Sequence, residues 1–475
     1  MKKFTIMILL ISSLAFAQSV LTLEDAVNIA LDKSYGIKSA GYSLEVSQKN
    51  LEAVKLGLFT SINMEFDLPN YFESLSSQFN PSTGKEEFFQ RGNTRLEGRL
   101  NLRQPLIFSN GYINLTGSVF GRDQFGTSIS KTRDYYTNFN VSLYQPLFTF
   151  NNQQANLDRA EIRLEKAQRN YDKSELDLIY SVTAAFYNLY EAKENVKITE
   201  EKVSQTEESY NTASNKFKAG LIAEVEALQL EVDLSSSKNE LLNSRRRFEE
   251  LLNDFKILIG IPLEDKIDIV SSLGYNPVNV DLESAIASAL KNRPDLLNTK
   301  DDIYLSELSV DEVDAQRSIK AEINARYGIN RNDEEIKNIF SDFLDDKSVT
   351  LTLSIPVWDW GQNAREVEAA QANVKLTQLQ YDNLNEIIKN EIITSVNRLN
   401  SAKSRVEVLS KSVDVAEKSY KISLERFKAG TITSFDLSQM QIRLTETRLN
   451  NISALIDYQI ALADLERKTM IKYGN

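Results

Sequence analysis

The residue types in this chain restrict the chemistry that it can perform. Its 475 residues include no histidine and no cysteine, which removes the commonest general base and all thiolate chemistry. Zinc hydrolases and Ser-His or Cys-His enzymes are therefore excluded. The 67 Asp and Glu residues are dispersed along helix faces and form no carboxylate pair suited to acid–base catalysis. We expect no enzymatic activity, no metal and no cofactor.

The N-terminus predicts export. Lys2 and Lys3 precede an apolar run at 4–16, and Ala15-Phe16-Ala17 offers a small-x-small cleavage site, so residues 1–17 are interpreted as a secretory signal peptide. A short buried helix is the alternative. Loss of the two lysines changes the formal net charge from −12 to −14. An acidic exported chain is a poor candidate for binding nucleic acid, which requires clustered Lys and Arg.

Part of the sequence occurs twice at an offset of 210 residues. Pro146-Leu147-Phe148 corresponds to Pro356-Val357-Trp358, and Phe-Lys-Ala-Gly recurs unchanged at 217–220 and 427–430. A fixed offset over so long a stretch predicts a duplicated structural unit. We therefore expect a first repeat at 18–280 and a second at 281–475, each with a leader helix, strands and a long helix pair.

Long helices are the main predicted elements. Residues 151–219 lack glycine and proline, and their apolar residues recur in steps of three or four, near the ~3.5-residue period of a left-handed coiled coil. Further helices are expected after each Ala-Gly, where glycine terminates the preceding helix, and after two Leu-Glu-x-Ala leaders. The expected ranges are 362–429, 223–260, 433–472, 35–58 and 295–318, with leaders at 23–31 and 282–290. An ordinary coiled coil is the alternative.

Strand-like alternation separates the short helices from the long ones. Apolar residues alternate with polar ones in segments of about ten residues, which is typical of transmembrane barrel strands; half-buried strands of a soluble sheet are the alternative. The alternating segments are 62–68, 135–143, 321–329 and 349–357. The leaders lie 259 residues apart, so the first repeat has about 49 extra residues, and these hold two more such runs, Thr94–Arg103 and Gly111–Gly121.

One chain cannot close such a barrel alone. Open sheet edges are not tolerated in lipid, and closed barrels need at least about eight strands, whereas this sequence offers four to six. Three copies would supply 12 strands, or 18 if the extra hairpin joins. Aromatic residues where strands meet long helices fit a belt at the inner water–lipid boundary, with core packing as the alternative. These residues are Phe148, Phe150, Trp358 and Trp360.

In this order the motifs resemble the TolC-type outer-membrane efflux proteins (outer membrane factors) over essentially the whole mature sequence. The resemblance rests on the paired leaders, the Gln145-Pro146-Leu147 and Ile355-Pro356-Val357 junctions and the duplicated Phe-Lys-Ala-Gly tips. It implies a homotrimer with one outer-membrane β-barrel and a hollow coiled-coil α-barrel in the periplasm. It also implies partners, namely a periplasmic adaptor (membrane fusion protein) and an inner-membrane pump. The extra hairpin departs from the family's two strands per repeat and could instead fold outside the barrel.

The resemblance also suggests roles for residues at the helix tips. Asp436 matches one carboxylate that the family places at its closed periplasmic entrance, while the second acidic position is Gln439 and Glu226 is the acidic residue of the first tip. Three copies of Asp436 facing a narrow bore would attract cations; a solvated aspartate at a helix N-terminus is the alternative. Adaptor contact is implied for Phe217, Lys218, Ala219, Gly220, Leu221, Phe427, Lys428, Ala429, Gly430 and Thr431.

These expectations combine into a passive exit duct of a tripartite efflux or type I secretion system, crossing the outer membrane and the periplasm. The alternative is a periplasmic coiled-coil scaffold or adaptor without channel activity. The sequence leaves open the cargo, which could be drugs, metals, siderophores or polypeptides. It also leaves open the nature of the entrance lock and the identity of the adaptor and pump.

Overall fold

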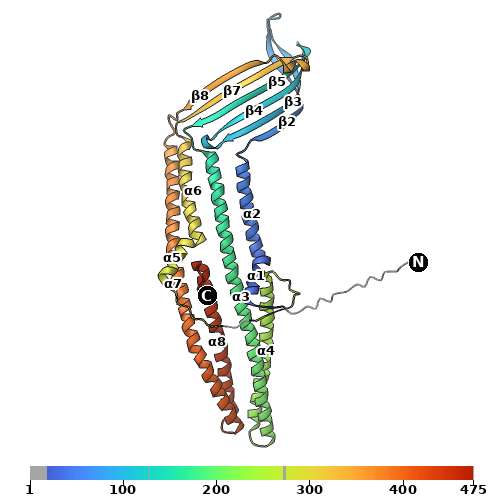
Figure 1. The fold of residues 1–475 in the computed structure, drawn as a ribbon. Coiled ribbons are helices and arrows are strands. Elements are labelled where there is room, and N and C mark those ends of the chain that lie inside the picture. The colour runs from blue at the N-terminus through green and yellow to red at the C-terminus, as the bar shows by residue number, and fades with distance from the viewer. Residues whose placement is uncertain (1–18, 128, 271–273, 474–475) are drawn as a thin grey trace, which may run out of the picture. The chain divides into compact units, whose positions relative to one another are not determined.

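The computed structural model describes residues 19–127, 129–270 and 274–473, so the predicted signal peptide lies outside the described residues. The chain forms two compact units, each described here by itself. Among the described residues, the tip unit comprises 19–44, 168–270, 274–297 and 382–473, and the sheet unit comprises 45–127, 129–167 and 298–381. Figure 1 shows the elements along the chain.

The predicted helices all occur, with ends within three residues of expectation. They are α1 (Leu23–Lys33), α2 (Tyr35–Leu56), α3 (Asn152–Lys218), α4 (Glu224–Ile259), α5 (Leu282–Asn292), α6 (Pro294–Gln316), α7 (Gln362–Lys428) and α8 (Ser434–Thr469). Among the described residues, none of these helices has the length and hydropathy needed to span a membrane.

Local sequence sets the helix ends. Thr22 and Asp25 form a reciprocal capping box at the start of α1, which satisfies backbone N–H groups that a helix leaves unpaired. The hairpin helices stop at Gly220 and Gly430, whose φ angles are 72° and 76°. This left-handed conformation is open to glycine at little cost.

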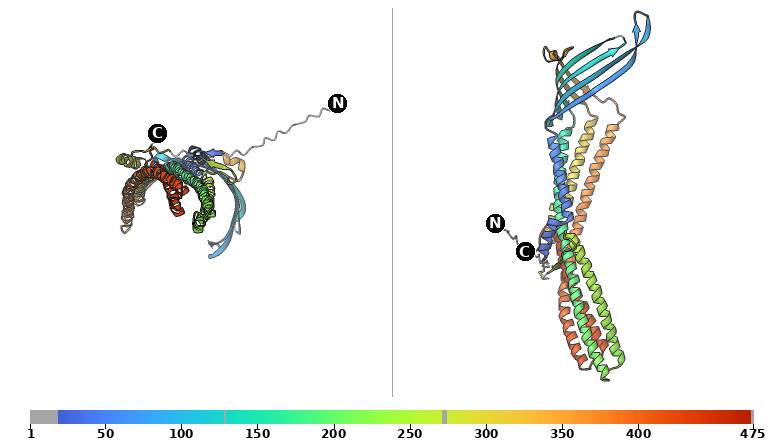
Figure 2. Two further views of the ribbon diagram at one scale, coloured as in Figure 1. Left: turned by 90° about the horizontal axis from the view of Figure 1, so that it is seen from below. Right: turned by 90° about the vertical axis from the view of Figure 1, so that its right-hand side faces the viewer.

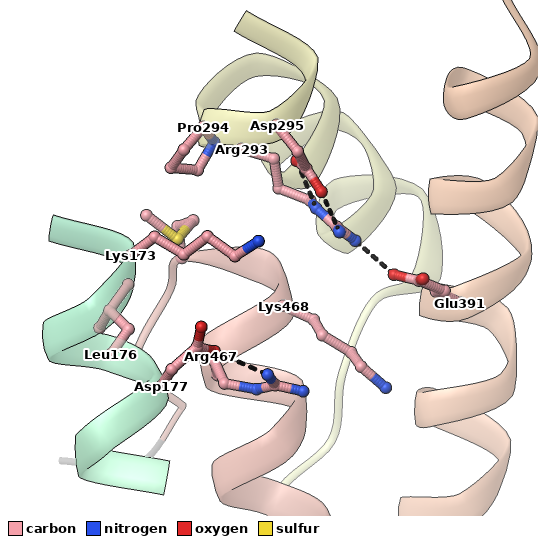
Figure 3. Close-up of a pocket in the computed structure, with 10 residues that line it drawn as sticks. Lys173, Leu176, Asp177, Arg293, Pro294, Asp295, Glu391, Arg467 and Lys468 are labelled. Carbon is pink, nitrogen blue, oxygen red and sulfur yellow. Dashed lines mark hydrogen bonds and ion pairs between the residues drawn. The ribbon is translucent and has the colours of Figure 1, made fainter. Parts of the chain in front are cut away.

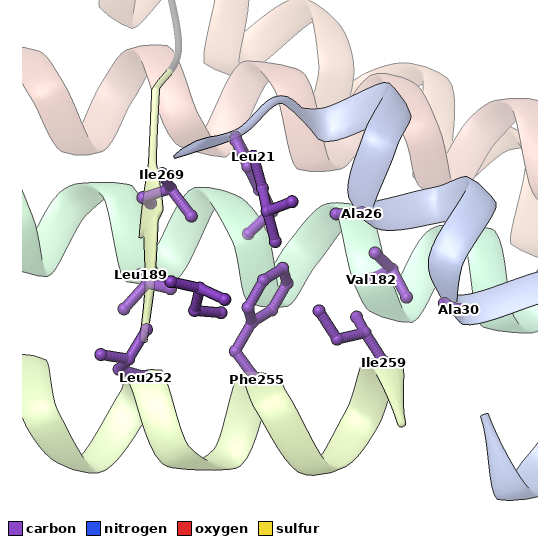
Figure 4. Packing of buried hydrophobic residues seen from close by; sticks show 11 residues of the cluster. Leu21, Ala26, Ala30, Val182, Leu189, Leu252, Phe255, Ile259 and Ile269 are labelled. Atoms are coloured by element: carbon purple, nitrogen blue, oxygen red, sulfur yellow. The ribbon is translucent and has the colours of Figure 1, made fainter. Parts of the chain in front are cut away.

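The main core of the tip unit packs α1, α3 and α4 around a short parallel strand pair (Figure 4). The pair consists of β1 (Ser19–Leu21) and β6 (Ile267–Ile269). Phe186 of α3 and Phe255 of α4 meet edge to face, with ring centroids 6.1 Å apart, and both side chains are fully buried. These contacts fix the leader helix against the first long hairpin.

The sheet unit contains a six-stranded antiparallel sheet with the order β2-β3-β4-β5-β7-β8. The strands are β2 (Ser61–Asn80), β3 (Lys85–Leu106), β4 (Gly111–Gly126), β5 (Ile129–Leu147), β7 (Lys320–Asp333) and β8 (Leu344–Ser354). The extra hairpin predicted from the sequence therefore lies inside the sheet, since β3 and β4 separate β2 from β5. The strand predicted to reach residue 357 ends at Ser354, just before Pro356, which has no N–H for a ladder.

The two faces of this sheet differ in polarity. One row of paired residues crosses five strands on the apolar face: Ile62, Leu102, Leu115, Val141 and Tyr327. Residues of this face are exposed in the single chain, including Met64, Phe66 and Leu351. A sheet face that is apolar and open to its surroundings requires another apolar phase or partner to cover it.

The opposite face carries ion pairs and stacked aromatic rings. Glu97, only 4% exposed, lies between Arg95 and Arg99, with nitrogen–oxygen distances of 2.7 and 3.1 Å. The Arg95 guanidinium lies over the Phe120 ring at 3.8 Å from its centroid, and Phe120 stacks on Tyr136. This face is therefore built from paired charges and aromatic rings.

The β2–β3 hairpin is longer than its neighbours. The register of β2 against β3 shifts between Asp67 and Asn70, and β3 pairs with β4 only from Arg91 onward. Beyond that point the two strands pair only with each other, and Figure 2 (right) shows their end projecting past the other strands. Pro69 lies within the register shift, at a position where a missing N–H is tolerated.

Two junctions at the base of the sheet are built alike. The Gln104 side-chain amide donates to the carbonyl of Pro105 and to that of Leu58. In the same way, Gln145 donates to the carbonyl of Pro146 and to that of Ser109. Gln-Pro-Leu thus ends both β3 and β5, although β5 leads into the long helix α3 and β3 leads only into a short 3-10 turn, η1 (Ile107–Ser109).

Candidate functional site

The candidate site is the end of the tip unit where the α3–α4 and α7–α8 hairpins turn (Figure 1). A buried apolar cluster joins the two hairpins. It comprises Ala213, Ala227, Leu230, Ala416, Tyr420, Phe427, Leu437 and Leu444. Burial, followed by the nearby Glu208 charge, raises the pKa of Tyr420 to about 12. The hairpins therefore pack as one body at this end.

The duplicated Phe-Lys-Ala-Gly tips have different environments. Phe427 is 2% exposed, whereas Phe217 is 39% exposed. Lys216 accounts for part of the difference, because its ammonium donates to the Phe427 carbonyl at 2.7 Å and lies 4.7 Å from the Phe427 ring centroid. Lys428 pairs with Glu208 at 3.4 Å. The second tip is thus held by the first, while the Phe217 ring remains accessible.

The structure places Asp436 in a capping box at the start of α8. Its carboxylate accepts hydrogen bonds from the Thr433 hydroxyl at 2.8 Å and the Thr433 N–H at 3.1 Å, and its own N–H donates to the Thr433 hydroxyl. The hydroxyl bond and then the backbone bond hold the pKa of Asp436 below its ordinary value. The carboxylate is exposed and ionised at neutral pH.

The other two predicted entrance residues lie on the same turns. Glu226 is in the first turn of α4, at the position that Asp436 occupies in α8, but the α4 cap residue Ala223 makes no side-chain hydrogen bond. Gln439 is exposed on the first turns of α8. All three predicted residues therefore lie near the turns. Of the three, only Asp436 takes part in a side-chain cap at the start of its helix.

Polar links between the two hairpins were not predictable from the sequence. Arg448 of α8 contacts Glu201 of α3 at 2.8 Å and Glu417 of α7 at 2.6 Å. The buried Gln441 donates to the Thr206 hydroxyl and to the Lys202 carbonyl. Polar residues on helix faces are common, so no sequence pattern identifies these partners.

A third link joins the two second helices of the hairpins. The Ser438 hydroxyl of α8 donates to Asp233 of α4 at 2.9 Å. With Arg448 and Gln441, it attaches α8 to the first hairpin at three successive levels. The two hairpins are therefore held together by separate polar contacts, each of which can break without the others.

A polar cavity of about 170 Å³ lies farther from the turns, between α3, α6, α7 and α8 (Figure 3). Arg293 pairs with Asp295 and Glu391, and Arg467 pairs with Asp177 at 2.7 Å. Lys468 pairs with Asp464 at 2.7 Å, so three of the lining cations have carboxylate partners and form a structural ion-pair cluster. In the described part of the chain, no group of three or more metal-ligating side chains occurs.

The predicted boundary aromatics lie at the base of the sheet unit. Trp358 and Trp360 are 72% and 88% exposed, and their rings meet edge to face. Phe148 is also exposed, while Phe150 is half-buried and its carbonyl accepts from the Asn110 amide. Phe148 and Trp360 have φ angles of 58° and 56°, a strained conformation for aromatic residues.

Comparison with known proteins gives the same architecture. Residues 112–260 and 285–469 match the family described as "Outer membrane efflux protein". Nodulation protein T of Rhizobium leguminosarum bv. trifolii is 20% identical over 262 residues. That match covers 52% of this chain and 53% of the relative, so the chain spans about half the length of this curated relative.

Solved channel structures share the fold. CusC superposes with a TM-score of 0.70 at 12% identity, covering 94% of this chain and 91% of CusC. The CmeC outer membrane channel of Campylobacter jejuni gives 0.69 at 15% identity, over 94% of this chain and 85% of CmeC. The MtrE outer membrane channel of Neisseria gonorrhoeae gives 0.67 at 15% identity, over 94% and 89%. The chain belongs to the outer membrane efflux protein family.

Proposed function

We propose that this protein is the passive outer-membrane exit duct of a tripartite efflux or type I secretion system. The observation that carries the proposal is the six-stranded sheet with one apolar face, one polar face and two open edges. In a bilayer the apolar face would meet lipid and the polar face would line water. The named relatives CmeC and MtrE are outer membrane channels, which supports the same location for this chain.

Three copies would complete the duct. Unpaired backbone groups in hydrocarbon cost several kcal/mol each, so the free edges of β2 and β8 need partners. Pairing between copies would close one barrel, and the long helices would continue it as a hollow periplasmic barrel. Family membership supports this assembly.

The hairpin tips would form the periplasmic entrance. Asp436, Glu226 and Gln439 would face the bore, and the ionised Asp436 carboxylates of three copies would attract cations there. The links from α8 to the first hairpin, through Arg448, Gln441 and Ser438, would hold the entrance closed. Breaking them would let the α7–α8 hairpin move outward.

The tips would also contact a periplasmic adaptor, which would connect the duct to an inner-membrane pump. Residues 217–221 and 427–431 carry this role, with the exposed Phe217 as an apolar contact and Phe427 supporting the turn from inside. Phe148, Phe150, Trp358 and Trp360 would anchor the barrel at the inner membrane boundary. The exposure of Phe148, Trp358 and Trp360 in the single chain supports that role over packing within one chain.

Two measurements test the proposal. Membrane fractionation of cells should place the protein in the outer membrane as an oligomer, and the purified protein should conduct ions in a planar bilayer. A periplasmic scaffold would be soluble and give no conductance. That result would overturn the duct and favour the scaffold.

A further inference from the structure

The free edges of the sheet determine how copies of this chain join. We propose that β2 of one copy pairs with β8 of the next in one register, Ser61 opposite Ser354, to give an eighteen-stranded barrel in the trimer. The inference rests on the proposed function. It adds the partner surface, the strand count and the residue pairs.

The directions of the strands allow only one type of junction. Six strands alternate in direction across the sheet, so β2 and β8 run antiparallel to each other. Copies inserted the same way into a membrane would place β2 parallel to β2, whereas β2 against β8 continues the antiparallel ladder. A head-to-tail junction of this kind can close into a ring.

The stagger of the sheet sets the register. Following the paired residues from Ser61 across β3, β4, β5 and β7 leads to Ser348 on β8. The last residue of β8 is Ser354, six positions farther along. Rotational symmetry puts the bases of all copies at one level, so Ser61 of the next copy should lie opposite Ser354.

This register gives a strand tilt typical of membrane barrels. A stagger of six residues over six strands makes the shear number equal to the strand number for any number of copies. With a rise of ~3.3 Å per residue and ~4.8 Å between strands, the strands would tilt by about 35°. Transmembrane barrels have tilts of about 35–45°, and a soluble barrel with equal shear and strand number tilts by about 36°.

Neighbouring registers fit less well. A slip of one residue would put apolar side chains opposite polar ones, and the apolar side chains of one edge strand would lie on the polar face of the barrel. A slip of two toward Thr352 would reduce the tilt to about 25°, below the range for membrane barrels. A slip of two the other way would place Ser61 opposite Pro356, which follows the end of β8 and has no N–H to donate.

The proposed register places apolar side chains of β2 opposite apolar side chains of β8. On the apolar face Ile62, Met64 and Phe66 would lie opposite Leu353, Leu351 and Val349. The ladder would end at Asp67, because β2 shifts register there and Pro69 cannot donate. Asn70 to Asn80 would then project past the junction with their β3 partners.

The β2–β3 hairpin belongs to the barrel for a further reason. Gln104 and Gln145 make the same contacts at the bases of β3 and β5. The two strands, β3 and β5, therefore end in equivalent junctions at the base of the sheet. A hairpin outside the barrel would need no such shared base.

Cysteine pairs test the register directly, since the natural chain has no cysteine. The variant Met64→Cys with Leu351→Cys should form disulfides between copies on mild oxidation in the membrane. Side chains directly opposite are about 4.5–5.5 Å apart at Cβ, against ~7–8 Å for diagonal neighbours. We expect covalent dimer and trimer with nothing larger, formed at least about tenfold faster than in either slipped pair.

The slipped pairs combine Met64→Cys with Leu353→Cys or with Val349→Cys. Faster cross-linking of either one would overturn the register. Cross-linking by Met64→Cys alone would overturn the β2–β8 junction. A conducting trimer that none of the three pairs cross-links would also overturn it while leaving the duct intact, whereas a soluble monomer would overturn the duct itself.

Discussion

Arg448 of α8 and Glu201 of α3 form an ion pair, with 2.8 Å between guanidinium and carboxylate. The two residues are far apart in sequence and belong to different hairpins. The same guanidinium contacts Glu417 on its own hairpin. Arg448 therefore links α7 to α8 within the second hairpin and links that hairpin to the first, in the same unit as the proposed entrance.

Replacement of Arg448 by Gln should open the entrance. Both ion pairs would be lost, and because the groups are partly exposed, each contributes only about 0.2–1 kcal/mol. We expect nearly unchanged stability but a several-fold increase in single-channel conductance. Arg405→Gln is the matched control, since Arg405 pairs with Asp457 inside one hairpin at 2.8 Å. Equal conductance in the two variants would argue against a lock at Arg448.

Asp436 has a capping role and a proposed electrostatic role, which variants can separate. Asp436→Ala should remove both, with a lower unfolding midpoint because the capping box is lost, together with higher leak conductance or weaker cation block. Thr433→Ala should weaken the cap but keep the carboxylate and the cation block. If conductance and block are the same in Asp436→Ala as in the unmodified protein, the pore role is wrong.

The cap should also depend on pH. Because the pKa of Asp436 is lower in the folded protein than in the unfolded chain, its contribution is present above the unfolded value of about 3.9 and is lost as pH falls through the folded value. The stability difference between the unmodified protein and Asp436→Ala should therefore shrink on acidification. Thermal unfolding at pH 7 and at pH 3 would measure it, and a constant difference would contradict the capping role.

The contribution of Glu466 to stability should depend on pH in the opposite sense. Burial, outweighing the Tyr473 N–H bond and the Lys472 charge, raises its pKa, so the ionised form costs stability at neutral pH and the cost disappears as pH falls below the unfolded value. Glu466→Gln keeps an oxygen for the Tyr473 N–H, 2.7 Å away. It should raise the unfolding midpoint at pH 7 and have little effect near pH 4.

The exposed Glu446 on the same helix provides the matched control for Glu466. Glu446→Gln should leave the midpoint unchanged at both pH values. A Glu466→Gln midpoint that does not rise at pH 7 would show that the protein solvates this carboxylate adequately.

Two glycines with the same φ angle should tolerate alanine differently. Gly260 and Gly430 both have φ of 76°, which costs an alanine about 1–2 kcal/mol. At Gly260 an added Cβ would also lie 2.6 Å from the Lys33 carbonyl, while at Gly430 nothing lies within 4 Å. Gly260→Ala should therefore lower the unfolding free energy clearly more than Gly430→Ala. Equal losses in denaturant titrations would mean that the α1 end adjusts freely.

Removing the β2–β3 hairpin should narrow the barrel. Deletion of residues 60–108 joins Phe59 to Ser109 and leaves β4, β5, β7 and β8, or twelve strands in a trimer. Since barrel diameter grows roughly linearly with strand number, pore area should fall to about half. Conductance would be compared in the Arg448→Gln background, so that the entrance is not limiting. An unchanged value would place the hairpin outside the pore wall.

The long helices were predictable because α3 and α7 carry uninterrupted apolar periodicity and end at glycine. Strand extents were less predictable: Phe88 and Phe89 are adjacent and break the alternation, so the first 9 residues of β3, 85–93, were not assigned. The three-residue strands β1 and β6 are too short to show any period. At the site, the spacing of Thr433 and Asp436 is a readable capping signal, whereas the partner of Arg448 is visible only in three dimensions.

The two Gln-Pro-Leu junctions imply that the number of strands in the sheet can change while the helices stay the same. A hairpin that begins and ends at the same base can be added or removed without lengthening a helix or moving a tip. The width of the proposed exit and the shape of the proposed entrance can therefore vary independently. If the tips bind an adaptor as proposed, relatives with different strand counts would present the same tip surface to it.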